Sequence, residues 1–173
     1  RSGRQGTGVM RAARPPGRTP AGRAVAREAR SALSTTPSAD RYEVTIPVED
    51  GDIDSLGHVN NTVYLRWVQD AAVAHWNSAA TPEELASLVW VVVRHEIDYK
   101  RAAMPGDRIV ARTWVGPATR LSFDRNTEIL REGDRVLLAK ARTVWVPLDP
   151  RTRRPCEVPD AVRERWSVQR VAR

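Results

Sequence analysis

Residues 50–76 read DGDIDSLGHVNNTVYLRWVQDAAVAHW, and this stretch decides the fold because it joins an aspartate-rich loop directly to an amphipathic helix. In the second half, apolar residues recur at i, i+3, i+4, i+7, i+8 and i+11, at positions Tyr64, Trp67, Val68, Ala71, Ala72 and His75. This spacing predicts a helix of about four turns that buries one face. We expect Asn60 or Asn61 to be its N-cap, because asparagine is a favoured capping residue.

Strand patterns lie on both sides of this helix. Residues 42–48 alternate between apolar and polar side chains, which is typical of a half-buried strand. After a short helix opened by Thr81 and Pro82, four more strands are predicted at residues 89–100, 108–116, 121–130 and 136–147. Within them we expect VWVVV, residues 89–93, to be covered on both faces, and Gly116-Pro117-Ala118 to end a strand. A last short helix is predicted with Asp160 as its cap.

This order of elements predicts an α+β fold. One long helix has only one sheet against which to bury its apolar stripe, and the successive strands are joined by short turns that favour antiparallel pairing. A curved open sheet leaves an edge strand exposed. Because pairing with a second copy covers such an edge, we expect a dimer.

The positive charge is concentrated at the start of the sequence. The formal net charge is +7, and residues 1–40 carry +6 of it through eight arginines against Glu28 and Asp40. This Arg-rich stretch contains no aromatic residue, so we expect a disordered N-terminal arm at residues 1–40. Nucleic-acid binding is not expected of the nearly neutral body, although the basic arm leaves open contact with polyanions.

The sequence carries no sign of a membrane span or a disulfide. No stretch approaches the roughly 20 apolar residues of a membrane helix, and no apolar segment follows the first arginines as in a secretory signal. The single cysteine, Cys156, has no partner for an internal disulfide and lies in a Pro-flanked loop with no histidine close in sequence. We therefore expect a soluble, cytoplasmic protein whose cysteine is not catalytic.

The aspartates of the loop invite a metal interpretation, which their spacing does not support. Asp50, Asp52 and Asp54 occupy positions 1, 3 and 5 of a twelve-residue calcium loop, but Ser55 replaces the required glycine and Asn61 the required glutamate. Asp52, Asp54 and His58 do not form a usual transition-metal spacing either. His75 and His95 lie on the apolar faces of the helix and a strand, where we expect core histidines. No metal and no cofactor are predicted.

A second interpretation of the loop is structural, and a third is chemical. Asp, Asn and Gly before a helix are the residues of a turn and a cap, and Gly57 tolerates a left-handed backbone. A helix N-terminus also presents unpaired N–H groups and a positive dipole end that stabilise a developing oxyanion. A carboxylate beside it can act on water or as a nucleophile. Together these roles suit hydrolysis of an activated acyl group.

Residues 52–67, DIDSLGHVNNTVYLRW, carry a resemblance to a known family. They are similar to the active-site segment D-x-D-x-x-G-x-V-x-x-x-x-Y of the hotdog-fold acyl-CoA thioesterases, the 4-hydroxybenzoyl-CoA thioesterase family. The likeness extends over about residues 41–160. It implies a single hotdog thioesterase domain at residues 41–173, with a long central helix wrapped by a curved antiparallel sheet, assembled as a dimer or a dimer of dimers.

The resemblance also implies roles for individual residues. Asp54 matches the catalytic carboxylate, either general base or nucleophile, and Asn61 the position whose backbone N–H polarises the thioester carbonyl. Gly57 lets the acyl thioester approach the backbone. His58, Asn60 and Tyr64 would shape the pocket or orient water. Separately, the phosphates of CoA need basic partners, for which Arg94, Lys100, Arg101 and Arg120 are the candidates.

A second resemblance bears on the substrate. The H-V-N-N run is similar to that of plant-type acyl-ACP thioesterases, but Leu56 stands where their loop carries an asparagine. We therefore expect a thioester hydrolase that releases a free acid and CoA from an acyl-CoA, in preference to an acyl carrier protein. A non-hydrolytic acyl-CoA-binding or dehydratase-type protein is the alternative from another class. The sequence has no Gly-x-Ser-x-Gly elbow of a serine hydrolase.

Overall fold

The computed structural model describes residues 41–167, so the predicted arm at residues 1–40 lies outside the described residues, as do residues 168–173. Strands and helices follow the predicted order. They are β1 (Tyr42–Pro47), a 3-10 turn η1 (Asp50–Asp52), α2 (Asn61–Ala79), α3 (Pro82–Ser87), β2 (Val89–Tyr99), β3 (Arg108–Ala118), β4 (Phe123–Arg131), β5 (Leu137–Leu148) and α4 (Asp160–Trp166).

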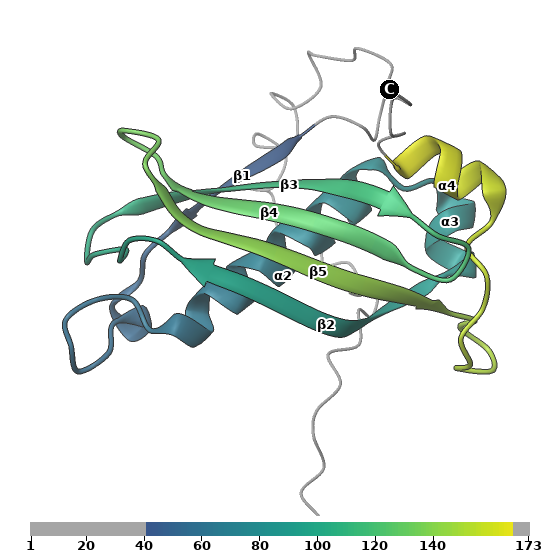
Figure 1. The fold of residues 1–173 in the computed structure, drawn as a ribbon, viewed down its shortest axis with the longest axis horizontal. Helices are drawn as coiled ribbons and strands as arrows, with labels where there is room; N and C mark the ends of the chain where they lie inside the picture. The colour runs from purple at the N-terminus through teal and green to yellow at the C-terminus, as the bar shows by residue number, and fades with distance from the viewer. Residues whose placement is uncertain (1–40, 168–173) are drawn as a thin grey trace, which may run out of the picture.

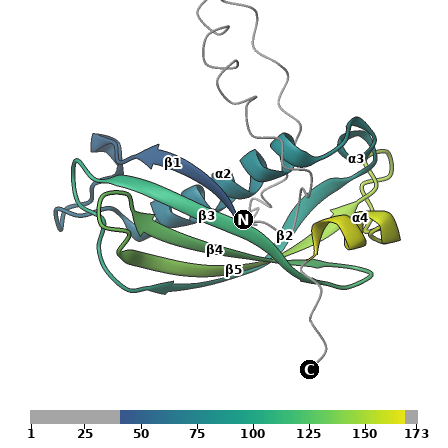
Figure 2. The ribbon, with the colours of Figure 1, turned by 90° about the horizontal axis from the view of Figure 1, so that it is seen from above.

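The five strands form one antiparallel sheet in the order β1-β3-β4-β5-β2. The sheet curves, and α2 lies along its concave face (Figures 1 and 2). The predicted α+β arrangement, a long helix packed on a curved antiparallel sheet, is confirmed. No helix in residues 41–167 is long and apolar enough to cross a membrane.

The apolar stripe of α2 is buried as its spacing predicts. Trp67, Val68, Ala71 and Ala72 are fully buried, and Tyr64 is 2% exposed. The helix packs mainly on β3 and β1, with fewer contacts to β4. Each large side chain buried in this way stabilises the fold by about 1.5–3 kcal/mol relative to an exposed position, so this interface holds the two layers together.

The end of β3 differs from the prediction. The strand does not stop at Gly116 but continues to Ala118, with a shift of register against β4 between Val115 and Ala118. Pro117 has no N–H to donate, so the ladder is interrupted while the strand direction is kept. A side chain at position 116 would place its Cβ 2.8 Å from Asn126 Nδ2, which explains why glycine occupies this crowded position.

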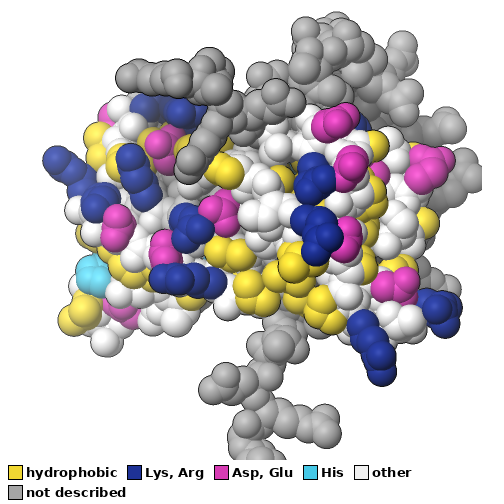
Figure 3. All heavy atoms as spheres, turned by 45° about the vertical axis from the view of Figure 1, so that its right-hand side comes forward, with side chains coloured by type: hydrophobic (Ala, Val, Ile, Leu, Met, Phe, Trp, Pro, Cys, Tyr) yellow, Lys and Arg dark blue, Asp and Glu magenta, His cyan; other side chains and the backbone are white. Residues whose placement is uncertain are grey.

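Three further predictions are corrected. Residues 89–93 are not covered on both faces: Val93 is 60% exposed and His95 is exposed rather than in the core. The reason is that β2 is an edge strand paired only with β5, while α2 lies over the other half of the sheet. In Figure 3 hydrophobic side chains gather at the lower edge, where Figure 1 places β2.

The predicted cap of the last helix also differs from the structure. The N-cap of α4 is Pro159, and Asp160 is its first residue.

His75 is the core histidine that the sequence predicts. It is 2% exposed, and its ring stacks on Tyr42 with centroids 5.0 Å apart. Burial, and secondarily the positive charge of Arg125, lowers the pKa of His75 to about 3. The ring is therefore neutral at pH 7, and its Nδ1 accepts a hydrogen bond from Arg125 Nη1 at 3.1 Å.

This neutral histidine predicts acid sensitivity. In the unfolded chain the imidazole has its ordinary pKa of 6.5, whereas in the folded protein it stays unprotonated down to about pH 3. The unfolded state thus binds more protons in this window, and the free energy of unfolding should fall by up to about 1.4 kcal/mol per pH unit as the pH drops below 6.5. Urea unfolding between pH 4 and 7 tests this. The slope should flatten in His75→Gln, and equal slopes in both proteins would contradict the assignment.

Candidate active site

The loop before α2 is a small closed hairpin. Ile53 and Val59 form an isolated antiparallel bridge, and the N–H of Asp54 donates to the carbonyl of His58 at 2.9 Å. The N–H of Asn60 donates to the carbonyl of Asp52, also at 2.9 Å. At the tip, Gly57 has a φ of +79°, the left-handed region that glycine adopts without a steric cost. The backbone therefore returns on itself just before the helix begins.

The first of the two motif aspartates, Asp52, is structural. Its side chain is 2% exposed. One oxygen accepts a hydrogen bond from Arg66 Nη2 at 2.5 Å, and the other accepts one from the N–H of Glu49 at 3.2 Å. Because Arg66 lies on α2, this ion pair ties the loop to the helix.

The second aspartate, Asp54, lies differently. It is half-buried, and its Oδ1 accepts a hydrogen bond from the N–H of Leu56 at 2.8 Å. The Nδ1 of His58 is 3.7 Å from the same oxygen. Its Oδ2 has no hydrogen-bond partner among residues 41–167. One oxygen is thus fixed by the loop, while the other is available to a ligand.

Asn60 is the N-cap of α2. Its Oδ1 accepts hydrogen bonds from the N–H of Thr62 at 2.9 Å and from the Thr62 hydroxyl at 2.7 Å. Asn61 is consequently the first helical residue, and its side chain is exposed. The first amides of a helix have no acceptor within the helix. The backbone N–H of Asn61 has none elsewhere in the described part of the chain.

A surface cavity of about 380 Å³ opens beside this helix end. The loop and helix contribute Leu56, His58, Val59, Asn61 and Tyr64 to its lining, and the end of β2 and the following segment contribute Tyr99, Lys100, Arg101 and Ala102. Two tyrosines fix its walls. The Tyr99 hydroxyl donates to the carbonyl of Asn61 at 3.0 Å, and the Tyr64 oxygen accepts from the N–H of Ala103 at 2.8 Å. Burial raises the pKa of both phenols, so they remain neutral donors and acceptors.

The structure brings together most of the residues predicted from the sequence. His58, Asn61, Tyr64 and Lys100 line the cavity. The loop that borders it contains Asp54, Gly57 and Asn60, which are not among the lining residues.

Arg94 lies elsewhere on β2, where its Nη2 is 2.6 Å from Glu96. Tyr99 is a lining residue that sequence reasoning did not select. The signal for it was present, because Tyr99 alternates with the polar side chains of β2.

The aspartates do not assemble a metal site. Residues 41–167 place no three His, Cys, Asp or Glu side chains where they would hold an ion together. Asp52 instead uses its oxygens on Arg66 and the backbone, and Asp54 has the His58 Nδ1 3.7 Å from its Oδ1. The candidate groups at this site are one carboxylate, one imidazole and a helix N-terminus.

The arrangement has relatives among known proteins. The sequence profile of one family, described as the thioesterase-like superfamily, matches residues 48–166. This range includes the loop, α2 and all later strands.

Two solved structures share the fold. The PA2801 protein of Pseudomonas aeruginosa superimposes with a TM-score of 0.64 and 25% identity, over 72% of this chain and 98% of that one. A thioesterase from Thermus thermophilus, solved with coenzyme A and Zn, gives a TM-score of 0.61 and 32% identity, over 71% of this chain and 89% of that one.

Plant proteins are similar over a smaller part of their length. The chloroplastic acyl-[acyl-carrier-protein] hydrolase FATB3 of Cuphea viscosissima is 27% identical over 124 residues, which are 71% of this chain and 30% of the plant protein. A palmitoyl-acyl carrier protein thioesterase of Gossypium hirsutum is 30% identical over 105 residues, 56% of this chain and 25% of that protein. The chain thus spans less than a third of the length of these curated relatives.

The cap geometry predicts a graded effect on stability. Asn60→Ala removes the acceptor of the Thr62 N–H and should lower the free energy of unfolding by about 1 kcal/mol. Asn60→Ser retains a capping oxygen and should lie close to the parent protein. Chemical denaturation of the three proteins measures the difference. Equal losses in both variants would show that the capping bond is not what stabilises this helix end.

Proposed function

The chain belongs to the thioesterase-like superfamily and has the hotdog fold, and from that premise we propose that it hydrolyses an acyl-CoA to a free acid and CoA. The observation that carries the proposal is the position of Asp54, whose carboxylate is held by the loop that borders the cavity at the start of α2. A hydrolase needs a group that acts on water and a group that stabilises negative charge. We assign the first task to Asp54 and the second to the N-terminal end of α2.

We assign stabilisation of the oxyanion to the N-terminal end of α2. In this proposal the thioester carbonyl oxygen accepts a hydrogen bond from the backbone N–H of Asn61, which has no other acceptor in the described residues. The positive end of the α2 dipole acts in the same direction. The exposed Asn61 side chain has no part in this step. The hydrogen bond from Tyr99 to the Asn61 carbonyl holds the next peptide group, between Asn61 and Thr62, and so anchors the residue that carries this N–H.

We assign to Asp54 the attack on the thioester carbonyl carbon, either through an activated water or directly. As a base, its free Oδ2 accepts a proton from water while the water oxygen bonds to the carbonyl carbon; the C–S bond then breaks, and the CoA thiolate takes up the proton. As a nucleophile, Oδ2 bonds to the carbonyl carbon itself and expels the thiolate, and water then hydrolyses the mixed anhydride. His58, near Oδ1, orients the carboxylate in either route.

Several features support CoA as the carrier. Lys100 and Arg101 lie at the cavity and offer positive charge for phosphates. The Thermus relative was solved with coenzyme A, whereas the plant relatives act on acyl carrier protein, and Leu56 replaces an asparagine of the plant-type loop. Arg94 is a weaker candidate for CoA binding because it already pairs with Glu96.

We further propose that the protein assembles as a dimer or a dimer of dimers through β2. This edge strand leaves Val93 60% exposed and Tyr99 42% exposed. Antiparallel pairing with the β2 of a second copy would satisfy its free backbone groups. Sedimentation equilibrium tests this, and a monomer at micromolar concentration would contradict it.

Replacement of Asp54 is the direct test of the mechanism. Asp54→Asn should lower kcat on acyl-CoA substrates by at least about 100-fold, because removing a positioned base or nucleophile has effects of that size. Released thiol provides the readout over a panel of aliphatic and aromatic acyl-CoAs. Asp50→Asn is the matched control, since Asp50 is an exposed aspartate close in sequence to which the mechanism assigns no role. Unchanged turnover in folded Asp54→Asn would contradict the mechanism.

The same panel separates hydrolysis from the alternatives. An acyl-CoA-binding protein would show saturable binding without thiol release, and a dehydratase-type protein would change the acyl group while leaving the thioester intact. Parallel reactions with acyl-ACP and acyl-CoA of equal chain length compare the carriers. We expect kcat/KM to be higher for acyl-CoA.

A further inference from the structure

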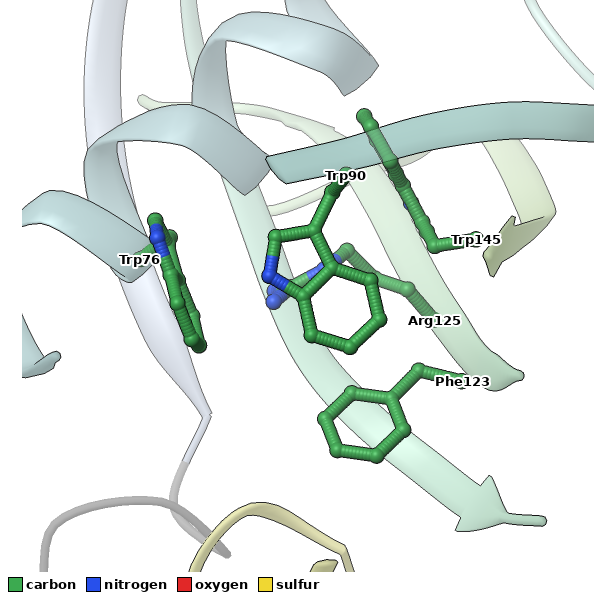
Figure 4. Close-up of a pocket in the computed structure, with 5 residues that line it drawn as sticks. All are labelled: Trp76, Trp90, Phe123, Arg125 and Trp145. Carbon is green, nitrogen blue, oxygen red and sulfur yellow. The ribbon is translucent and has the colours of Figure 1, made fainter. Parts of the chain in front are cut away.

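The C-terminal half of α2 is held against the sheet by close aromatic packing. Trp76 packs against Trp90 of β2 with ring centroids 5.6 Å apart, and Trp90 packs in turn against Phe123 of β4 at 4.8 Å. In Figure 4 the Arg125 side chain passes behind the Trp90 ring, with Trp76 and Trp145 on either side. The space left between these side chains is about 10 Å³, enough for one water-sized group at most. Packing therefore fixes this half of the helix.

The N-terminal end of α2 lies beside an open cavity instead. This cavity of about 380 Å³ lies between the start of the helix and the segment that follows β2. Asn61, the first helical residue, is exposed. Helix ends fray more readily than helix centres, because their backbone hydrogen bonds are incomplete. The position of the Asn61 N–H therefore depends on contacts other than close packing.

Two tyrosines connect the walls of this cavity, and each bonds to the backbone of the opposite wall. Tyr99 of β2 donates through its hydroxyl to the carbonyl of Asn61 at 3.0 Å. Tyr64 of α2 accepts a hydrogen bond from the N–H of Ala103 at 2.8 Å. The two rings meet edge to face with centroids 5.3 Å apart, a favourable geometry that limits the motion of the Tyr99 ring. The helix start and the segment after β2 are thus joined twice.

The two hydrogen bonds have different tasks. Ala103 is fully buried, so its N–H needs the Tyr64 oxygen as an acceptor, and this bond stabilises the fold. The Asn61 carbonyl lies in the first turn of α2, where the helix supplies an N–H donor of its own. The bond from Tyr99, which is 42% exposed, is therefore an additional contact. Its effect is on where Asn61 lies.

We propose that Tyr99 is a positioning residue for the hydrolysis, whose hydroxyl holds Asn61 so that the Asn61 N–H meets the thioester oxygen. This inference rests on the proposed function, in which that N–H is the oxyanion donor. Tyr99 itself does not act on the substrate. An oxyanion donor stabilises the transition state more than the bound substrate, so its displacement lowers kcat and leaves KM almost unchanged.

Tyr99→Phe tests the proposal, because it removes the hydroxyl and keeps the ring. On the best acyl-CoA of the panel, kcat should fall by about three- to tenfold, as for one lost hydrogen bond, while KM stays within about twofold. Tyr42→Phe is the matched control, since it removes the hydroxyl of a tyrosine that stacks on His75. His75 is about 21 Å from Asn61 along the helix axis. Equal kcat in the two variants would overturn the proposal.

The pH dependence separates positioning from proton transfer. A residue that only positions Asn61 changes kcat by the same factor at every pH, so the pH profile of Tyr99→Phe should keep its shape. Burial raises the pKa of Tyr99, and the phenol is protonated at neutral pH. If this phenol were a general acid, the alkaline limb of the profile would belong to it. Loss of that limb in Tyr99→Phe would overturn the positioning role.

A measurement without turnover separates this inference from the proposed function. In the parent protein and in Tyr42→Phe, the Asn61 N–H should have an NMR order parameter near the value of about 0.85 that is typical of rigid backbone. In Tyr99→Phe the order parameter should be lower. An unchanged value would overturn the proposal even if the protein hydrolyses acyl-CoA. If no acyl-CoA releases thiol, the proposed function fails, and the order parameters still decide whether Tyr99 holds Asn61.

Discussion

Burial of one face of α2 against the concave side of the sheet is the constraint on which the rest of the structure depends. The helix buries this face by lying across β1, β3 and β4. As a result, its two ends lie beside different groups of side chains. The N-terminus meets the hairpin loop and the cavity near Lys100. The C-terminal half meets the buried cluster of His75 and Arg125.

The two motif aspartates show how environment separates residues that look alike in sequence. Asp52 and Asp54 are two positions apart, yet the backbone turn sends one into the protein and leaves the other half-exposed. Both carboxylate oxygens of Asp52 accept hydrogen bonds, one from Arg66 and one from the Glu49 N–H, so Asp52 fixes the loop. Asp54 has only Oδ1 engaged and retains an oxygen for a substrate or water. In the proposed mechanism, Asp52 thus stabilises the loop and Asp54 carries the reaction.

The sequence was sufficient for those features that depend on local periodicity. The stripe from Tyr64 to His75, the alternation of β1 and the turn residues predicted the helix, the strands and their order. The sequence was insufficient where the position of an element in the fold decides whether its residues are buried. VWVVV has the composition of a covered strand, but the sheet order makes β2 an edge, and no local pattern reveals that order. The same limit applies to Arg94 and Lys100, which are close in sequence but differ in whether they reach the cavity.

Among the site residues, Asn60 and Gly57 follow from elementary backbone requirements, and the structure assigns each a definite turn or cap. The alternation along β2 places the Tyr99 side chain on one face of the strand, but it does not reveal the contact with Asn61, which is 38 residues away in sequence. That contact has a mechanical consequence. The Tyr99 hydroxyl of the edge strand β2 donates to the Asn61 carbonyl, so any displacement of β2 is transmitted to the first residue of α2. A chain that docked along β2 would therefore move the first turn of α2, and with it the positive end of the helix dipole, without touching the helix.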